Sequence, residues 1–206
     1  MRASVEVYLA SSNPGKLREF RELASAAVHA VPLALELLPR FDSLPAFEEN
    51  APTFAENAAG KALHYSRLCN GLVLADDSGL VVPALGGAPG VLSARYAGPT
   101  ATSAERMAKL LAELRGKSGE ERRAHFVCAI ALARRGRATA VVTDRVDGEI
   151  LQAPRGGGGF GYDPIFYFPP LGKTFAEISS EEKNEFSHRG KAFRKVLDLI
   201  ASGHPS

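Results

Sequence analysis

The sequence contains no tryptophan, only two cysteines and two methionines among its 206 residues, and almost no excess of charge of either sign. Lysine and arginine total 25 against 23 aspartate and glutamate residues, which leaves a formal net charge of +2. A nearly neutral chain has no bulk field that would attract duplex nucleic acid or an anionic membrane surface. Any affinity for anions must therefore come from a few placed lysines and arginines.

Long apolar runs are also missing. No uninterrupted apolar stretch approaches the ~18 residues that a membrane span needs, and Glu6 puts an acid where a signal peptide would need an apolar core. Cys69 and Cys128 stand far apart in apolar surroundings and outside any C-x-x-C pair, so we expect reduced thiols rather than a disulfide or a metal site. These absences favour a cytoplasmic protein.

What is present is the composition of an ordinary globular protein, with 45% hydrophobic residues and with 20 glycines and 13 prolines spread along the chain. A chain of this length builds one large domain, or two lobes, around a real core. Neither a repeat nor a low-complexity linker divides it. The sequence therefore predicts a single domain over residues 1–206.

The spacing of apolar residues predicts strands and helices in alternation. In the first half of the chain we expect a strand at 5–10, a turn at 11–15 followed by a helix, a helix at about 53–69, and a short strand at 72–75 that ends on Asp76-Asp77-Ser78-Gly79. A loop at 80–98 and a helix at 103–114 follow. In the second half we expect a β-hairpin over 122–149 that turns at Arg135-Gly136, an irregular segment at 156–170, and a C-terminal helix capped by Ser187.

Two glycine patterns resemble nucleotide-binding motifs but lack their context. Gly156, Gly158 and Gly161 satisfy G-x-G-x-x-G, yet a run of four glycines matches almost any such pattern, and no helix is expected after it. Gly172-Lys173-Thr174 resembles the end of a Walker A loop, but Tyr167 stands where that motif needs glycine. We therefore expect neither a dinucleotide-binding site nor a P-loop.

The turn Ser11-Ser12-Asn13-Pro14-Gly15-Lys16 lies between a predicted strand and a predicted helix. Free backbone N–H groups at a helix start, small hydroxyl side chains and one lysine make a good phosphate cradle. The same stretch also suits an Asx or Ser turn with a solvated lysine. This stretch alone leaves both interpretations open.

Acidic residues are the second candidate feature. Adjacent acids such as Asp76 and Asp77 often form only a turn, but two carboxylates at the end of a strand also suit Mg²⁺, a hard cation that prefers oxygen ligands. Glu48 and Glu49, in a polar loop, offer a further carboxylate.

Other side chains supply cations and rings. Asn57 and Lys61 share one helix face, which simple solvation also explains. A histidine and an arginine at a helix start oppose the helix dipole, so the pair at 188–189 suggests an anionic or electron-rich ligand. Phe160 and Tyr162, flanked by glycines, suit either a base platform or packing beneath a loop. Together these features are the parts of a nucleoside triphosphate hydrolase.

Six motifs in this order closely resemble those of the inosine triphosphate pyrophosphatase family, and the resemblance covers nearly the whole chain. The motifs are residues 11–16, 53–58, 75–80, 86–98, 158–166 and 181–192. The resemblance implies an α/β fold with a long central mixed β-sheet flanked by helices, two lobes with an active-site cleft between them, and a homodimer. It also implies Mg²⁺-dependent cleavage of ITP, dITP or XTP to the monophosphate and pyrophosphate, with no nucleic-acid or membrane partner.

Carried over by motif position, the resemblance implies roles for individual residues. Asp77 is the expected metal ligand and general base, with Glu48 as a second metal carboxylate and Asp76 close by. The residues expected to hold the triphosphate and sugar are Ser11, Ser12, Asn13, Lys16, Asn57, Lys61, Ser78 and Lys183. Those expected to hold the base are Phe160, Gly161, Tyr162, Asp163, His188 and Arg189. Ser12 and Gly157 depart from the family pattern, which commonly has Gly and Thr there.

The chemistry follows from these residue types. Mg²⁺ and the lysines would neutralise the charge that accumulates as pyrophosphate leaves, and Asp77 would take a proton from the attacking water. A donor such as Arg189 or His188 is satisfied by the 6-oxygen of hypoxanthine or xanthine and left unpaired against the 6-amino group of adenine.

Two rival functions stay open. A septum-inhibitor-like pyrophosphatase, which acts on modified pyrimidine nucleotides, would continue with Pro-Arg-Arg where this chain has Asn13-Pro14-Gly15-Lys16. A non-catalytic nucleotide- or RNA-binding module would use the aromatic glycine loop and the basic helix. The acid pair argues against such a module, because carboxylates repel phosphate unless a metal intervenes.

Overall fold

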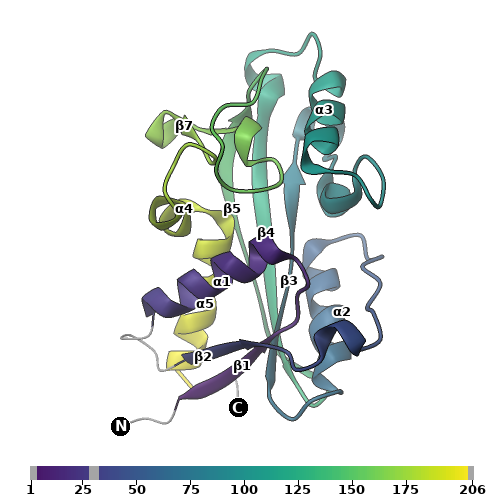
Figure 1. Ribbon diagram of the computed structural model, residues 1–206, viewed down its shortest axis with the longest axis vertical. Helices are drawn as coiled ribbons and strands as arrows, with labels where there is room; N and C mark the ends of the chain where they lie inside the picture. Colours follow the sequence, from purple (N-terminus) through teal and green to yellow (C-terminus); the bar gives the residue numbers. More distant parts are fainter. Residues whose placement is uncertain (1–3, 28–32, 204–206) are drawn as a thin grey trace. The chain divides into compact units, whose positions relative to one another are not determined.

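The computed structural model describes residues 4–27 and 33–203 (Figure 1). The chain forms two compact units, and each unit is assembled from separate stretches of sequence. Unit 1 comprises Met1–Asp77, Cys128–Asp144 and Arg189–Ser206, and unit 2 comprises Ser78–Val127 and Arg145–His188. Each unit has its own hydrophobic core.

The strands form a seven-stranded sheet in the order β2-β1-β3-β4-β5-β6-β7. Their bounds are β1 Val5–Leu9, β2 Leu33–Leu37, β3 Leu72–Val81, β4 Arg123–Arg134, β5 Arg137–Ile150, β6 Phe166–Phe168 and β7 Lys173–Thr174. β1 pairs in parallel with β2 and β3, whereas β6 pairs antiparallel with β5 and β7. The expected mixed sheet flanked by helices is confirmed, and the cleft between two lobes stays a prediction.

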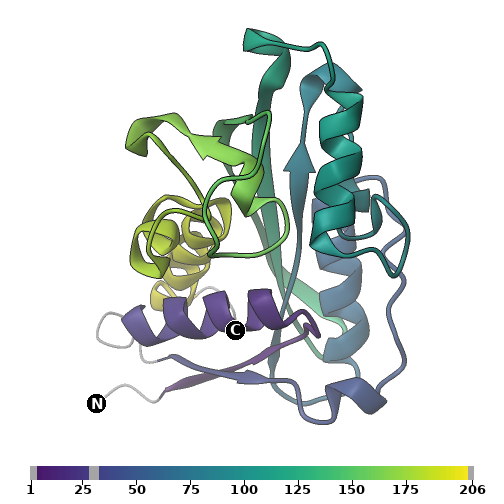
Figure 2. The same cartoon turned by 45° about the horizontal axis from the view of Figure 1, so that its top comes forward.

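Helices cover both faces of the strands in unit 1 (Figures 1 and 2). The helices are α1 (Pro14–Ala27) and α5 (His188–Ala201) on one face and α2 (Phe54–Ser66) on the other. Because successive strand residues point to opposite faces, Leu72 and Leu74 of β3 pack with α1 and α5, while Val73 and Ala75 pack with α2. Burial on both faces explains the continuous apolar run in this strand.

Unit 2 packs around aromatic rings. Helix α3 (Ser103–Glu113) contributes Leu110 to a core that contains Phe126, Phe166 and Phe175. The ring centroids of Phe126 and Phe166 lie 4.6 Å apart, and those of Phe166 and Phe175 lie 4.9 Å apart. Helix α4 (Ser180–Phe186) begins with a capping box formed by the residues at 179 and 182. Tyr162 and Ile165, which follow the glycine-rich segment before β6, also belong to this core.

Most predicted elements are confirmed within a few residues of their expected ends. Helix α2 begins after Thr53, whose Oγ1 accepts the backbone N–H of Glu56 at 3.2 Å, and it ends at Ser66, three residues earlier than predicted. Strands β2, β6 and β7, a separate α4 and the short 3₁₀ turns, among them those at 83–85 and 90–95, were not predicted. Cys69 and Cys128 are both free thiols, and burial raises the pKa of Cys128 to about 12.

The prediction that the strand at 72 ends at Ala75 is wrong, because β3 continues to Val81. Asp76 and Asp77 therefore lie inside a buried strand rather than in a turn. A strand interior accepts carboxylates only where cations or hydrogen-bond donors from other elements compensate them. Such compensation comes from residues distant in sequence and leaves no local signal.

Candidate active site

The turn between β1 and α1 is an Asx turn that caps the helix. Asn13 Oδ1 accepts the backbone N–H groups of Gly15 at 3.0 Å and Lys16 at 3.1 Å, and Ser11 Oγ accepts the N–H of Asn13 at 3.3 Å. Pro14 is the first helical residue, where a missing N–H breaks no helical hydrogen bond. The turn interpretation is confirmed, but its lysine is not merely solvated, since the Lys16 ammonium pairs with an acid of β3.

Asp76 is the centre of a buried charge cluster on the α1 and α5 face of unit 1. Its Oδ2 lies 2.8 Å from Lys16 Nζ and 3.8 Å from Arg189 Nη2. Burial by itself raises the pKa of Asp76, but the charges of Lys16, Arg189 and Lys61 outweigh it and hold the pKa below its usual value. Asp76 is therefore ionised, and it holds these cations in place.

Asp77 points to the opposite face of β3, toward α2. Its Oδ2 accepts the side-chain N–H of Asn57 at 3.0 Å, and the residue is 5% exposed. Burial, helped by the charges of Glu49 and Asp76, raises the pKa of Asp77 to about 6, although Lys16 opposes the shift. A carboxylate with a pKa near the working pH is suited to act as a general base.

Lys61 joins the loop before α2 to β3. Its Nζ donates to Glu49 Oε1 at 2.7 Å and to the backbone carbonyl of Asp76 at 3.3 Å. Burial lowers the pKa of Lys61, but the charges of Asp76 and Glu49 outweigh it, so the pKa is raised and the amine stays protonated. Glu48 is exposed, and its Oε2 accepts from Asn50 Nδ2 at 2.9 Å. Of the two adjacent glutamates, the structure brings Glu49 to the acid and lysine cluster.

Arg189 lies in unit 1, where it pairs with two acidic side chains. It is 2% exposed, and its Nη1 donates to Glu19 of α1. The charges of Glu19 and Asp76 raise the pKa of Arg189 against the effect of burial. Sequence reasoning missed Glu19, although it follows Lys16 by three positions on the same helix face, and that spacing was the available signal.

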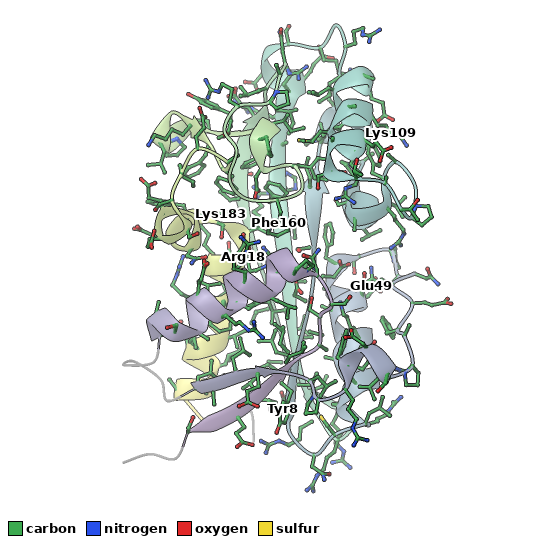
Figure 3. The ribbon with its side chains drawn as sticks, viewed as in Figure 1. Tyr8, Arg18, Glu49, Lys109, Phe160 and Lys183 are labelled. Carbon is green, nitrogen blue, oxygen red and sulfur yellow. The ribbon has the colours of Figure 1, made fainter. Side chains whose placement is uncertain are left out.

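Lys183 belongs to a second cluster, in unit 2, with Asp163 and Phe160. Its Nζ lies 2.5 Å from Asp163 Oδ2 and 4.8 Å above the centroid of the Phe160 ring (Figure 3 labels both Lys183 and Phe160). The same Oδ2 accepts the backbone N–H of Phe160 at 2.7 Å. The structure thus brings Lys183 together with the predicted base-binding residues Phe160 and Asp163 within unit 2.

Two other residues of the set predicted to bind the base, Tyr162 and His188, are buried within unit 2. Tyr162 is 4% exposed, and its hydroxyl donates to the carbonyl of Ser93 at 2.9 Å. The ring of His188 stacks on Phe126, with centroids 4.8 Å apart and an angle of 10° between the planes. Tyr162 therefore fits the interpretation of an aromatic packed beneath a loop. Gly161 has nothing within 4 Å of an added Cβ, so its backbone faces open space.

The donor set of unit 1 fits a hard divalent cation that keeps several waters. Across residues 4–27 and 33–203, no group of three or more histidine, cysteine or acidic side chains forms a ready-made metal site. Mg²⁺, however, is commonly held by only one or two carboxylates plus substrate phosphates. The charge of Glu49 already raises the pKa of Asp77, so a cation between these carboxylates would relieve that repulsion.

Adjacent carboxylates whose pKa values shift in opposite directions, beside buried lysines, mark a candidate catalytic site. Such a site suits a hydrolase that acts on phosphates with the help of a metal ion. A model of the Ham1 family matches residues 7–199. The chain therefore belongs to the Ham1 family, and the family resemblance of the six sequence motifs is confirmed.

Individual relatives agree with this assignment. The chain is 52% identical over 191 residues to a dITP/XTP pyrophosphatase of Geobacillus kaustophilus, and the match covers 93% of this chain and 92% of the relative. It is 48% identical over 206 residues to a dITP/XTP pyrophosphatase of Thermus thermophilus, covering 100% of this chain and 96% of the relative. The solved structure of a HAM1 protein from Coxiella burnetii has a TM-score of 0.85 and 41% identity, and the match covers 96% of this chain and 99% of that one.

Proposed function

We propose that the protein hydrolyses deaminated purine nucleoside triphosphates, namely dITP, ITP and XTP, to the monophosphate and pyrophosphate. The names of its relatives support this substrate class. The observation that carries the reaction is the contrast within β3, where Asp76 is paired with cations while the pKa of Asp77 is raised to about 6. Asp76 holds the cationic side chains in place, and Asp77 accepts a proton.

Unit 1 supplies the groups that act on the triphosphate. Asp77 accepts the proton of the water that attacks the α-phosphorus, and Lys16 and Lys61 donate to phosphate oxygens as negative charge develops on them. Asp77 and Glu49 are the residues we expect to hold Mg²⁺, which when bound supplies charge neutralisation at the phosphates. We propose Glu49 in place of Glu48, because the Glu49 carboxylate reaches Lys61. Ser11, Ser12, Asn13 and Ser78 remain proposed contacts to phosphate and sugar.

Unit 2 supplies the groups that hold the base. We propose that the Phe160 ring stacks on the purine, with Lys183 and Asp163 at its edge and Gly161, Tyr162 and His188 completing the set. The Lys183 ammonium lies over the Phe160 ring and can donate a hydrogen bond. The 6-oxygen of a deaminated purine would accept that bond, whereas the 6-amino group of adenine would leave the donor unpaired, so we expect adenine to bind less well. Because Arg189 pairs with Glu19 and Asp76, we propose that it holds the Asp76 carboxylate in place and does not contact the base.

Dependence on Mg²⁺, a homodimeric assembly and a cytoplasmic location belong to the same proposal, and the family resemblance supports them. No helix within the described residues has both the length and the apolar character needed to cross a bilayer.

A product screen tests the reaction. The protein is incubated with Mg²⁺ and ITP, XTP, dITP, GTP, ATP or UTP, and both pyrophosphate and orthophosphate are quantified. We expect pyrophosphate from the three deaminated purine nucleotides. Orthophosphate as the product would contradict the reaction, a preference for UTP would favour the pyrimidine-directed rival, and ITP binding without product would favour a non-catalytic module.

A further inference from the structure

The loop that carries Glu49 is seated on α2 by Phe47. A Cβ added to Gly60 would lie 2.6 Å from Cζ of the Phe47 ring, which is closer than real Cβ atoms approach another atom. The backbone N–H of Phe47 donates to the Tyr65 hydroxyl at 3.3 Å, and His64 Nε2 donates to the carbonyl of Pro45 at 2.9 Å. The ring thus occupies the space left by the missing side chain of Gly60, and neighbouring side chains of α2 hold the backbone beside it.

The far end of the same loop is fixed by Asn57. This side chain is fully buried, and its Oδ1 accepts the backbone N–H of Ala51 at 2.9 Å. Its Nδ2 lies 3.3 Å from the carbonyl of Ala51 and 3.0 Å from Asp77 Oδ2. One amide therefore ties the end of the loop to the proposed base, and these hydrogen bonds within the protein explain Asn57 better than a substrate contact does.

Glu49 stands between these two attachments. Its Oε1 lies 2.7 Å from Lys61 Nζ, and Lys61 lies on α2 between Asn57 and Tyr65. Residues 57, 61 and 65 of a helix share one face, because they are spaced by four positions. The loop is therefore fixed before and after Glu49 by the same helix that holds its carboxylate.

We propose that Phe47 and Asn57 are positioning residues for a divalent cation, because through the loop at 45–51 they set where the Glu49 carboxylate stands relative to Asp77. The inference rests on the proposed function, which assigns the cation to these two carboxylates. The position of Glu49 then depends on Gly60, since even one methyl group there must displace the Phe47 ring.

The test is Gly60→Ala, with Mn²⁺ alone as the probe and the electron paramagnetic resonance signal of free Mn²⁺ as the readout. Groups that orient metal ligands typically contribute 10- to 100-fold in metal affinity, so we expect binding to weaken by about 10-fold or more. Alanine favours a helix more than glycine does, so a weaker helix would not explain the loss. Asn57→Ala should weaken Mn²⁺ binding in the same way.

A rescue and a matched control separate positioning from general damage. Phe47→Leu added to Gly60→Ala makes room for the methyl group and should recover part of the affinity. Gly71→Ala creates a similar overlap with an aromatic ring, 2.2 Å from Tyr8, and Figure 3 shows Tyr8 well apart from Glu49. This control should lower the unfolding temperature and leave Mn²⁺ affinity unchanged.

Three results would overturn the inference: a wild-type protein that binds no Mn²⁺, a folded Gly60→Ala variant with wild-type affinity, or an equal loss of affinity in Gly71→Ala. Because the assay contains no nucleotide, its outcome is distinct from that of the product screen. A protein that shows the expected Mn²⁺ pattern but releases no pyrophosphate from dITP, ITP or XTP would support the positioning role and refute the proposed activity.

Discussion

At the scale of single residues, two adjacent aspartates acquire opposite properties because a strand turns their side chains to opposite faces. Asp76 meets Lys16 and Arg189, and their charges hold its pKa low. Asp77 meets the neutral amide of Asn57 and the field of Glu49, and burial raises its pKa to about 6. The two carboxylates therefore differ in protonation because of their neighbours and not because of their type.

Asp77→Asn should stabilise the metal-free protein at pH 8 while removing turnover. The folded pKa of about 6 exceeds the reference value of 3.8, so between these values the folded state keeps a proton that the unfolded state has lost. Stability therefore falls as the pH rises through this window. A neutral asparagine does not titrate, so the variant does not lose this free energy of unfolding, which for a shift of two pKa units amounts to about 3 kcal/mol.

Urea unfolding in EDTA at pH 4 and pH 8 measures this difference. The variant should exceed the wild type in free energy of unfolding at pH 8 and match it near pH 4. An equal pH dependence of the two proteins would show that Asp77 is not the titrating group.

Turnover should depend on the same proton. With Asp77 as general base, kcat/KM should fall about tenfold per pH unit below the pKa of the base, because the protonated acid accepts no proton. A bound cation favours the ionised carboxylate, so raising the Mg²⁺ concentration should move the break in the profile from near 6 to lower pH. If the pH of the break does not change with Mg²⁺ concentration, the general base and the metal ligand are different residues.

At the scale of elements, the glycine run before β6 contains positions with different demands. Gly159 has a φ of +66°, and an added Cβ would lie 2.2 Å from Asp163 Oδ2, the atom that also accepts from Phe160 and Lys183. An added Cβ on Gly157 meets nothing within 4 Å. Of these two positions, only Gly159 needs a glycine, because its φ is positive and an added Cβ would overlap with Asp163.

Gly159→Ala should therefore raise KM for dITP and lower the free energy of unfolding by about 1 kcal/mol or more, since a side chain at positive φ is strained. Gly157→Ala is the matched control from the same run and should leave both quantities close to wild type. Steady-state kinetics and urea unfolding of the two variants provide the comparison. Equal effects would mean that the run acts through flexibility alone.

At the scale of the whole molecule, a balanced net charge conceals a concentrated cluster. The chain carries only +2 overall, yet Lys16, Lys61 and Arg189 lie around the acids of β3 within unit 1. A near-zero net charge is therefore compatible with a binding site for a ligand as small as one triphosphate. The field that matters is local.

Mg²⁺ should raise the unfolding temperature of the wild-type protein, because a ligand that binds only the folded state stabilises it by mass action. EDTA should abolish turnover, and added Mg²⁺ should restore it. In Asp77→Asn, Mg²⁺ should produce a much smaller thermal shift than in the wild type. A full shift in that variant would place the cation elsewhere.

The sequence by itself determined what depends on neighbouring residues. Apolar periodicity predicted α1, α3 and the β4–β5 hairpin, and the polar turn before α1 was readable because Asn13 caps a helix that starts at Pro14. The order of the six motifs indicated the family. These features are local or are ordered along the chain, so no three-dimensional contact was needed to find them.

Only the tertiary structure decided which of several plausible partners meet. It paired Glu49 with Lys61, placed Lys183 beside Asp163, and paired Arg189 with the acids of unit 1. It also kept both aspartates inside a strand where a turn was expected. The physical reason is the same in each case: charges and hydrogen bonds act through space between segments that lie far apart in the chain, so the choice is made only when the elements pack together.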